Sequence, residues 1–456
     1  MGYLKRTWAA LVAKVDIPKP TAWPPPKDEQ RVTELLEYGY KRDPVGDKIH
    51  TAFACLFMFA LPLTTASVSI SMALLLGYSL LRLPTTWRTL TPLLRSKIFI
   101  LLVGWCAWSI LSIAWSPATT VGLDMLKPLR MVFLIPILWP IMKHWKYLLL
   151  AFLTGVFLQN LVQISEVIGS LFLNGIDWKT GNRLSALVGL GSHTGKNALF
   201  MAFAVILWVG IAFEHRQHRP LAIFSALLAF GGMLATVSMA VSVGFFIASL
   251  FSCLYIVACR LVSKKQLLYI LLIATLAAGS TTLLVRGRFV EKYDSATQGV
   301  KEFLEGSVDE TSSTQLRLHW WTRSLQEMST NSGVTTWLIG NGIGSVSEID
   351  FSKEGTEVFE TSEHVHNSYI QILYEEGIFG LLLFLGFIAS MAKQSFAPSS
   401  QVGWCLAPIS IAGVLIWSVT TFFENSQSSG RPFAMVVLLA LFMMYLNNYS
   451  PKVKQA

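Results

Sequence analysis

A histidine and an asparagine stand side by side where a polar stretch of the chain gives way to an apolar one. His366-Asn367 is followed by nine residues, by Gly377-x-x-Gly380 and by the apolar run 381–387. A histidine ring exchanges a proton near neutral pH, which suits it to be a general base. Asparagine caps a helix, and paired glycines let another helix backbone approach closely. We therefore predict polar chemistry at the end of a membrane helix; the alternative is a histidine that only caps it.

A second polar group lies about fifty residues upstream of the histidine. Arg317, Trp320 and Trp321 fall on one side of a helix expected between Gln315 and Met328. An arginine fork donates two hydrogen bonds to a phosphate and stays charged, and a tryptophan stacks on a sugar ring. The group predicts contact with a sugar diphosphate. The alternative is an aromatic helix at the membrane surface whose arginines extend toward lipid headgroups.

Further cations border apolar segments on the same expected side of the membrane and are candidates for phosphate binding. They are Arg130, Arg183, Lys196 and Arg288. For each, the alternative is a helix-end anchor or a contact with lipid headgroups. The polar loop has no spacing typical of a zinc site and no Asp-x-Asp pair. The sequence therefore predicts neither a metal nor another cofactor.

The composition indicates that lipid is the solvent of most of this chain. Of its 456 residues, 53% are hydrophobic and only 14% are charged, whereas soluble domains have about 25% charged residues. The net charge of +9 comes from short basic clusters between apolar runs. This arrangement is typical of membrane topology signals and argues against nucleic acid as a partner.

A membrane-crossing helix needs about 20 apolar residues, and the chain offers about twelve such segments. We expect an all-α polytopic membrane protein. The expected spans are residues 50–66, 67–83, 97–114, 124–142, 146–172, 196–213, 219–235, 237–259, 266–285, 367–392, 402–422 and 431–448.

Basic residues gather in alternate connections between these spans, which places both termini in the cytoplasm. Residues 286–366 then form one large loop on the outer, periplasmic side. Residues 1–48 are expected to be a polar cytosolic tail that is not a signal peptide, with either a short interfacial helix or no fixed structure. Residues 49–456 would make up the membrane domain.

At this point the chain resembles a known family. His366-Asn367 with Gly377-x-x-Gly380 is similar to the signature of the O-antigen ligase and polymerase superfamily. Other segments of residues 90–448 share its layout: Trp115-Ser116-Pro117 after the third span, Arg317 in the outer loop, and the tight turn Gly340-x-Gly342-x-Gly344.

The resemblance implies a GT-C-like, inverting, metal-independent glycosyltransferase of the bacterial inner membrane with a periplasmic active face. The donor would be a glycan on undecaprenyl diphosphate. The acceptor would be lipid A-core, for a ligase, or another growing glycan, for a polymerase, and we favour the ligase slightly. By the same resemblance, His366 would be the base or orienting group for the acceptor hydroxyl, beside Asn367. Arg317 would bind the diphosphate, with Trp320 near the sugar.

One position departs from the family. An arginine is usual after Thr-x-Ser in the tight turn between two spans, but Thr236-Val237-Ser238 is followed here by Met239. Arg130, Arg183, Lys196 and Arg288 are the candidates for a replacement, and the sequence does not single one out.

A transporter or flippase is the alternative from another class. Twelve spans suit it, but the sequence has no two-fold internal repeat and few charges at mid-span. An enzyme requires His366 and Arg317 to meet on one face, whereas a transporter requires two similar halves around a central site.

Overall fold

The computed structural model describes residues 32–174, 194–236, 238–258, 290–291, 293–305, 313–331, 333–349, 351, 364–396, 406–424 and 429–447. These residues form helices and no strand, which confirms the all-α class for the described part. The α-helices before the outer loop are α2 (Val32–Arg42), α3 (Pro44–Ala60), α4 (Thr65–Thr86), α5 (Lys97–Ser112), α6 (Thr119–Leu126), α7 (Leu134–Leu138), α8 (Trp145–Asn174), α9 (Thr194–Glu214), α10 (Arg219–Ala235) and α11 (Met239–Ala258).

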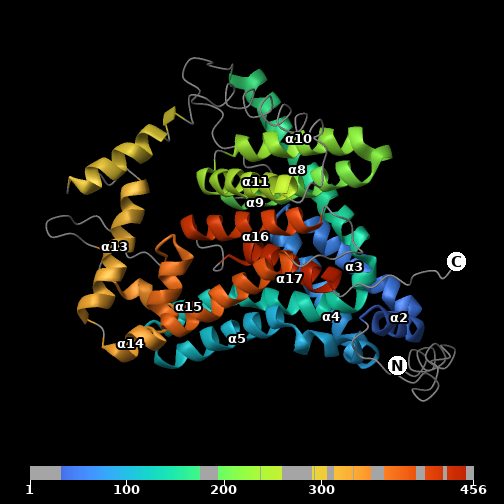
Figure 1. Ribbon diagram of the computed structural model, residues 1–456, viewed down its shortest axis with the longest axis horizontal. Helices are drawn as coiled ribbons and strands as arrows, with labels where there is room; N and C mark the ends of the chain where they lie inside the picture. The colour runs from blue at the N-terminus through green and yellow to red at the C-terminus, as the bar shows by residue number, and fades with distance from the viewer. Residues whose placement is uncertain are drawn as a thin grey trace.

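The later α-helices are α13 (Ser313–Asn331), α14 (Val334–Ile339), α15 (Ser368–Ser395), α16 (Leu406–Phe423) and α17 (Gly430–Asn447). Short 3-10 helices are η2 (Trp87–Arg95), η3 (Ile113–Trp115), η4 (Lys127–Phe133), η5 (Trp139–His144), η6 (Arg216–His218) and η7 (Ser345–Glu348). α13 and α14 lie at one end of the molecule and α2 lies at the other (Figure 1).

Described helices occupy every expected span except residues 266–285, which lie outside the described residues. Among the described residues, six helical segments are long and apolar enough to cross a membrane, and three shorter apolar helices accompany them. A multi-pass membrane protein is therefore supported, while the count of twelve and the GT-C-like arrangement stay predictions. Leu80, Leu81 and Leu250 are exposed on the helices, as expected where lipid covers the surface.

The N-terminal region contains more structure than its polar composition suggests. Val32, Leu35 and Leu36 are spaced along one face of α2 and are buried. α2 packs against η2 and η5, so residues 32–42 belong to the fold. Residues 1–31, including the expected interfacial helix, lie outside the described residues.

Two features of the core position the later helices. α5 packs along α15, and α16 packs against α11. α17 is buried along nearly its whole length and contacts α9, α15, α16 and the η4–η5 segment. In the first turn of α17 Arg431 and Phe433 are buried, and Asn197 is buried near the start of α9.

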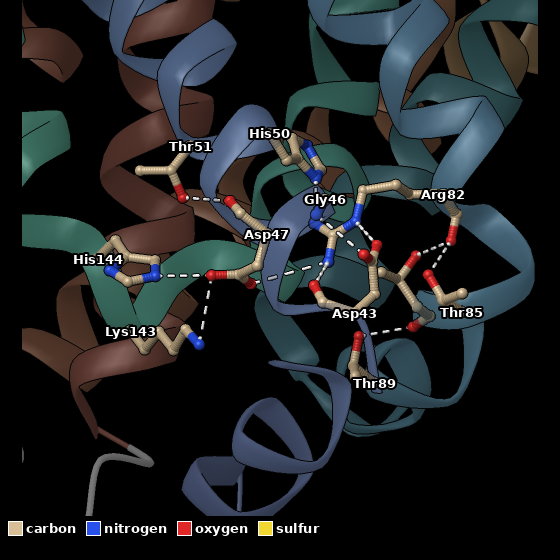
Figure 2. Close-up of polar contacts among 11 residues, drawn as sticks. Asp43, Gly46, Asp47, His50, Thr51, Arg82, Thr85, Thr89, Lys143 and His144 are labelled. Carbon is tan, nitrogen blue, oxygen red and sulfur yellow. Dashed lines mark hydrogen bonds and ion pairs between the residues drawn. The ribbon is translucent and has the colours of Figure 1, made fainter. Parts of the chain in front are cut away.

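A buried group of charges joins α3, α4 and η5, and we call it the Asp47 cluster: Asp43, Asp47, His50, Arg82, Lys143 and His144 (Figure 2). The Asp47 carboxylate is 1% exposed and lies 2.7 Å from His144 Nε2 and 3.3 Å from Lys143 Nζ. Arg82 donates from Nε to Asp43 at 2.9 Å. Arg82 and Lys143 belong to the basic residues whose distribution indicates the topology, and here they also fix three elements to one another.

Candidate functional site

The start of α15 holds His366 and Asn367 in a defined geometry. The Asn367 side chain accepts hydrogen bonds from the backbone N–H groups of Tyr369 at 3.0 Å and Ile370 at 3.1 Å, so it caps the helix. His366 has φ +51°, the one positive φ of a non-glycine residue in the described chain. Such a backbone is strained and is typical of functional sites. Trp320 stacks on the His366 ring with 5.4 Å between centroids.

A glutamate joins the two residues that sequence analysis ranked highest. Glu424 follows α16, and its Oε1 accepts a hydrogen bond from Arg317 Nη2 at 3.2 Å. Its Oε2 lies 3.6 Å from His366 Nδ1, slightly beyond hydrogen-bonding distance. We call Glu424, His366 and Arg317 the Glu424 cluster. All three side chains are about one-third exposed, although the His366 Nδ1 atom itself is buried.

The positive groups of the Glu424 cluster stabilise the ionised form of Glu424. Burial raises the pKa of the Glu424 carboxyl, but contact with His366 and the positive charge of Arg317 outweigh burial, so this pKa lies below its ordinary value. An ionised Glu424 beside Nδ1 favours the tautomer with its proton on Nδ1, which leaves Nε2 as the acceptor. His366 can then take a proton from a hydroxyl placed at Nε2.

Contacts between the outer loop and α15 hold this arrangement. Trp321 Nε1 donates to the Val365 carbonyl at 2.7 Å, directly before His366. His319 Nε2 lies 3.0 Å from the Phe351 carbonyl. A small core forms beneath them from Met328, Val346, Ile349, Phe351, Val365 and Tyr374. The expected helix at Gln315–Met328 is confirmed as the longer α13, which carries Arg317 and Trp320.

The glycine-rich turn packs against a break in α15. Gly377 has φ +70°, and a Cβ atom there would collide with the Leu338 carbonyl. Carbonyls just before the break accept from outside the helix: Tyr374 from Asn341 N at 3.0 Å, Glu375 from Gly342 N at 2.8 Å and Glu376 from Trp108 Nε1 at 2.9 Å. The glycine-rich turn therefore holds the first half of α15, which directly follows His366 and Asn367, in place.

The turn also meets the Trp115-Ser116-Pro117 segment. Ser116 Oγ donates to the Ile343 carbonyl at 2.7 Å. A Cβ on Gly342 would press into Ser116. Segments that are 227 residues apart in the chain are thus in direct contact next to the α15 break.

Of the four other candidate cations, two lie within the described residues. Lys196 is half-buried in the first turn of α9 and interacts electrostatically with Glu424. Arg130 is exposed on η4, and Arg183 and Arg288 lie outside the described residues. Within the described part of the chain, no group of three or more His, Cys, Asp or Glu residues is arranged to hold a metal ion.

Glu424 and Arg431 do not stand out in the sequence. Glu424 is a lone acid after an apolar run, and only the fold brings it to Arg317, 107 residues away. Arg431 begins the last span and resembles a helix-end anchor, yet it is buried. The sequence does offer one signal for Arg431. The polar residues 425–430 before it include no acid, so the nearest acidic residue in that connection is Glu424.

Comparison with protein-family models supports the resemblance. Residues 224–385 match the family model described as O-antigen ligase. This part of the chain is therefore similar to the O-antigen ligase superfamily. The matched region runs from α10 to α15 and includes Arg317, His366 and Gly377, whereas Lys196, Glu424 and Arg431 lie outside it. A search of curated proteins found no match.

Proposed function

We propose that the protein is a membrane glycosyltransferase of the bacterial inner membrane. It moves a glycan from undecaprenyl diphosphate to a sugar hydroxyl of an acceptor on the periplasmic face. The match of residues 224–385 to the O-antigen ligase family model supports transfer of a lipid-linked glycan in general. The observation that carries the proposal is the convergence of His366 and Arg317 on Glu424.

In this proposal His366 acts on the acceptor. Nε2 takes the hydroxyl proton as the acceptor oxygen attacks the anomeric carbon, and the bond from that carbon to the diphosphate oxygen breaks. A positioned base contributes roughly 10²–10⁴-fold to such a step. Attack from the face opposite the leaving group inverts the anomeric configuration. Glu424 orients the ring and stabilises the imidazolium that forms.

Arg317 acts on the leaving group. One terminal nitrogen of its guanidinium donates to Glu424, and the other N–H groups can donate to phosphate oxygens. Positive charge held at the departing diphosphate stabilises the transition state without reorganisation. The partly exposed Trp320–His366 pair is suited to a sugar, because aromatic rings stack on the C–H face of a sugar.

The meeting of Arg317 and His366 favours an enzyme over a transporter. A transport pathway carries its charges through the midplane, between two similar halves. The Glu424 cluster instead gathers at the end of the molecule where α13 and α14 lie (Figure 1).

The test is transfer by the purified full chain with a glycan on undecaprenyl diphosphate. Lipid A-core and a second lipid-linked glycan are offered separately as acceptors. We expect product on lipid A-core, as for a ligase. Product only as longer lipid-linked chains would instead make the protein a polymerase. No product with either acceptor would overturn the proposal.

A further inference from the structure

Arg431 is a buried cation at the first turn of α17. It is 4% exposed, and its Nη1 donates to the Leu63 carbonyl in the α3–α4 turn at 3.1 Å. Its guanidinium carbon lies 5.8 Å from the centroid of the Phe200 ring on α9. Three separate parts of the chain therefore enclose one positive charge.

The guanidinium is only partly satisfied. Nη2 is buried and has no hydrogen-bond partner among the described residues. Among those residues no carboxylate forms an ion pair with Arg431, and the oxygens of Glu424 face Arg317 and His366. A buried cation without an anion is costly, so its persistence points to an anion that arrives with a ligand.

Lys196 adds a second positive charge beside Arg431. It lies in the first turn of α9, the helix that also carries Phe200, and it interacts electrostatically with both Arg431 and Glu424. The neighbouring Gly195 is close to the α10–α11 turn, since a Cβ there would lie 3.7 Å from Ser238 Oγ. Lys196 thus lies within the electrostatic influence of both Arg431 and Glu424, next to the turn that begins α11 at Met239.

We propose that Arg431 and Lys196 form an anion subsite that binds the diphosphate of the lipid-linked donor. The proposal rests on the proposed function for the identity of the lipid. Arg431 supplies the unused N–H donors of its fork, and Lys196 supplies a mobile point charge. The Glu424 cluster is left to the sugar, the acceptor and the leaving oxygen. A phospholipid headgroup offers similar phosphate oxygens, and the experiment separates these two sources.

The experiment measures binding of undecaprenyl diphosphate to the full chain in phosphatidylcholine nanodiscs. We compare wild type with Arg431→Met, Arg431→Lys and Lys196→Met. Hydrogen bonds to charged groups correspond to about tenfold or more in affinity. We expect Arg431→Met to weaken binding about tenfold or more, and the other two variants to weaken it about three- to tenfold.

Arg219 provides a matched control at the start of another helix. Like Arg431 it is followed by proline, and it donates from Nε to a backbone carbonyl, that of Ala212, at 3.0 Å. Arg219→Met should leave binding of undecaprenyl diphosphate unchanged. The thermal midpoint of the empty protein gives a second readout. Removal of an unpaired buried charge should leave that midpoint equal or higher for Arg431→Met, whereas a purely structural arginine would lower it.

Two arms identify the source of the phosphate. The nanodiscs are prepared again with phosphatidylglycerol, and retained phospholipid is measured by native mass spectrometry. Loss of retained phosphatidylglycerol in Arg431→Met, with unchanged affinity for undecaprenyl diphosphate, would overturn the proposal in favour of a headgroup site. If Arg431→Met does not fold, Arg431→Lys and Lys196→Met decide: wild-type affinity in both overturns the subsite.

The outcomes also separate the subsite from the proposed function. Binding of undecaprenyl diphosphate that depends on Arg431, without glycan transfer to either acceptor, would sustain the subsite and overturn the function. Transfer by Arg431→Met with wild-type KM for the donor, together with wild-type affinity, would overturn the subsite and sustain the function.

Discussion

The Asp47 cluster and the Glu424 cluster combine the same types of side chain in opposite ways. Asp47 is 1% exposed and is enclosed by Lys143, His144 and Arg82. Glu424 is 36% exposed, and its contacts with Arg317 and His366 are longer, at 3.2 and 3.6 Å. The Asp47 charges are already compensated by the fold. The Glu424 cluster still has hydrogen-bond donors and acceptors that a ligand can use. This availability distinguishes a candidate site from a purely structural ion-pair cluster.

This comparison predicts that the two clusters fail in different ways when they are altered. Loss of a partner in the Asp47 cluster leaves uncompensated charge inside the protein, so stability should fall. Loss of a partner in the Glu424 cluster leaves groups that water still reaches, so stability should change little while transfer is lost.

The largest effect is expected for Asp47→Asn. Lys143, His144 and Arg82 would lose their shared carboxylate, which should cost about 3–5 kcal/mol of stability. The measurement is the thermal midpoint and the folded yield in detergent. Glu37→Gln, which removes the exposed pair with Lys41, is the control and should cost less than about 1 kcal/mol. A stable Asp47→Asn variant that has lost transfer would show that the Asp47 cluster is functional.

His366→Ala should next reduce glycan transfer by about 10²–10⁴-fold, since the base for the acceptor hydroxyl is removed. Its thermal midpoint should stay close to wild type, because the ring is part-exposed and Asn367 still caps α15. The readouts are initial transfer rates and thermal unfolding of the same preparation. Wild-type transfer by this variant would remove His366 from the chemistry.

Arg317→Lys should lower kcat/KM for the donor about 10–100-fold. Lysine keeps the charge but cannot hold Glu424 and a phosphate with one planar fork. Arg323→Lys is the matched control on the same helix, since its contact with Glu327 is at 4.0 Å and the substitution should be nearly neutral. Equal activity of both variants would show that charge alone is enough at Arg317.

The smallest effect concerns pH. The pKa of Glu424 is lowered in the fold, so its ionised form adds stability above about pH 4.5, and this addition is lost as the pH falls through the lowered pKa. Exposure to solvent keeps the gain below about 1 kcal/mol. The stability difference between wild type and Glu424→Gln should therefore be present down to about pH 4.5 and should shrink as the pH falls further. Thermal midpoints across this range test the sign; a difference that widens in acid would contradict it.

The sequence predicts the helices and the central pair of the site well, for local reasons. Long apolar runs specify helices in lipid, where every backbone group must find a partner within its own segment. His366 and Asn367 mark a helix start by their position, and Arg317 falls on a helix that contacts them. Each of these inferences needs only residues that are near one another in the chain.

The remainder depends on contacts between distant segments. Glu424 has no spacing that links it to Arg317, and the cations beside Asp47, namely Arg82, Lys143 and His144, come from distant parts of the chain. Arg431 resembles an anchor until its burial is known. Gly377 was interpreted as a site of close helix packing, and Leu338 does lie against it, but the positive φ that breaks α15 cannot be read from one glycine in an apolar run.

The break at Gly377 also divides α15 into two segments with different neighbours. In an unbroken helix a change of tilt at one end moves the other end, over a rise of about 1.5 Å per residue. Here the segment from Ser368 to Glu376 is bound to the Gly340–Gly344 turn and to Trp108, whereas residues 378–395 pack against α5, α16 and α17. Membrane helices adjust to bilayer thickness by tilting, and a tilt of the second segment with its neighbours would be taken up at Gly377. We therefore expect His366 to keep its position relative to Arg317 when bilayer thickness changes.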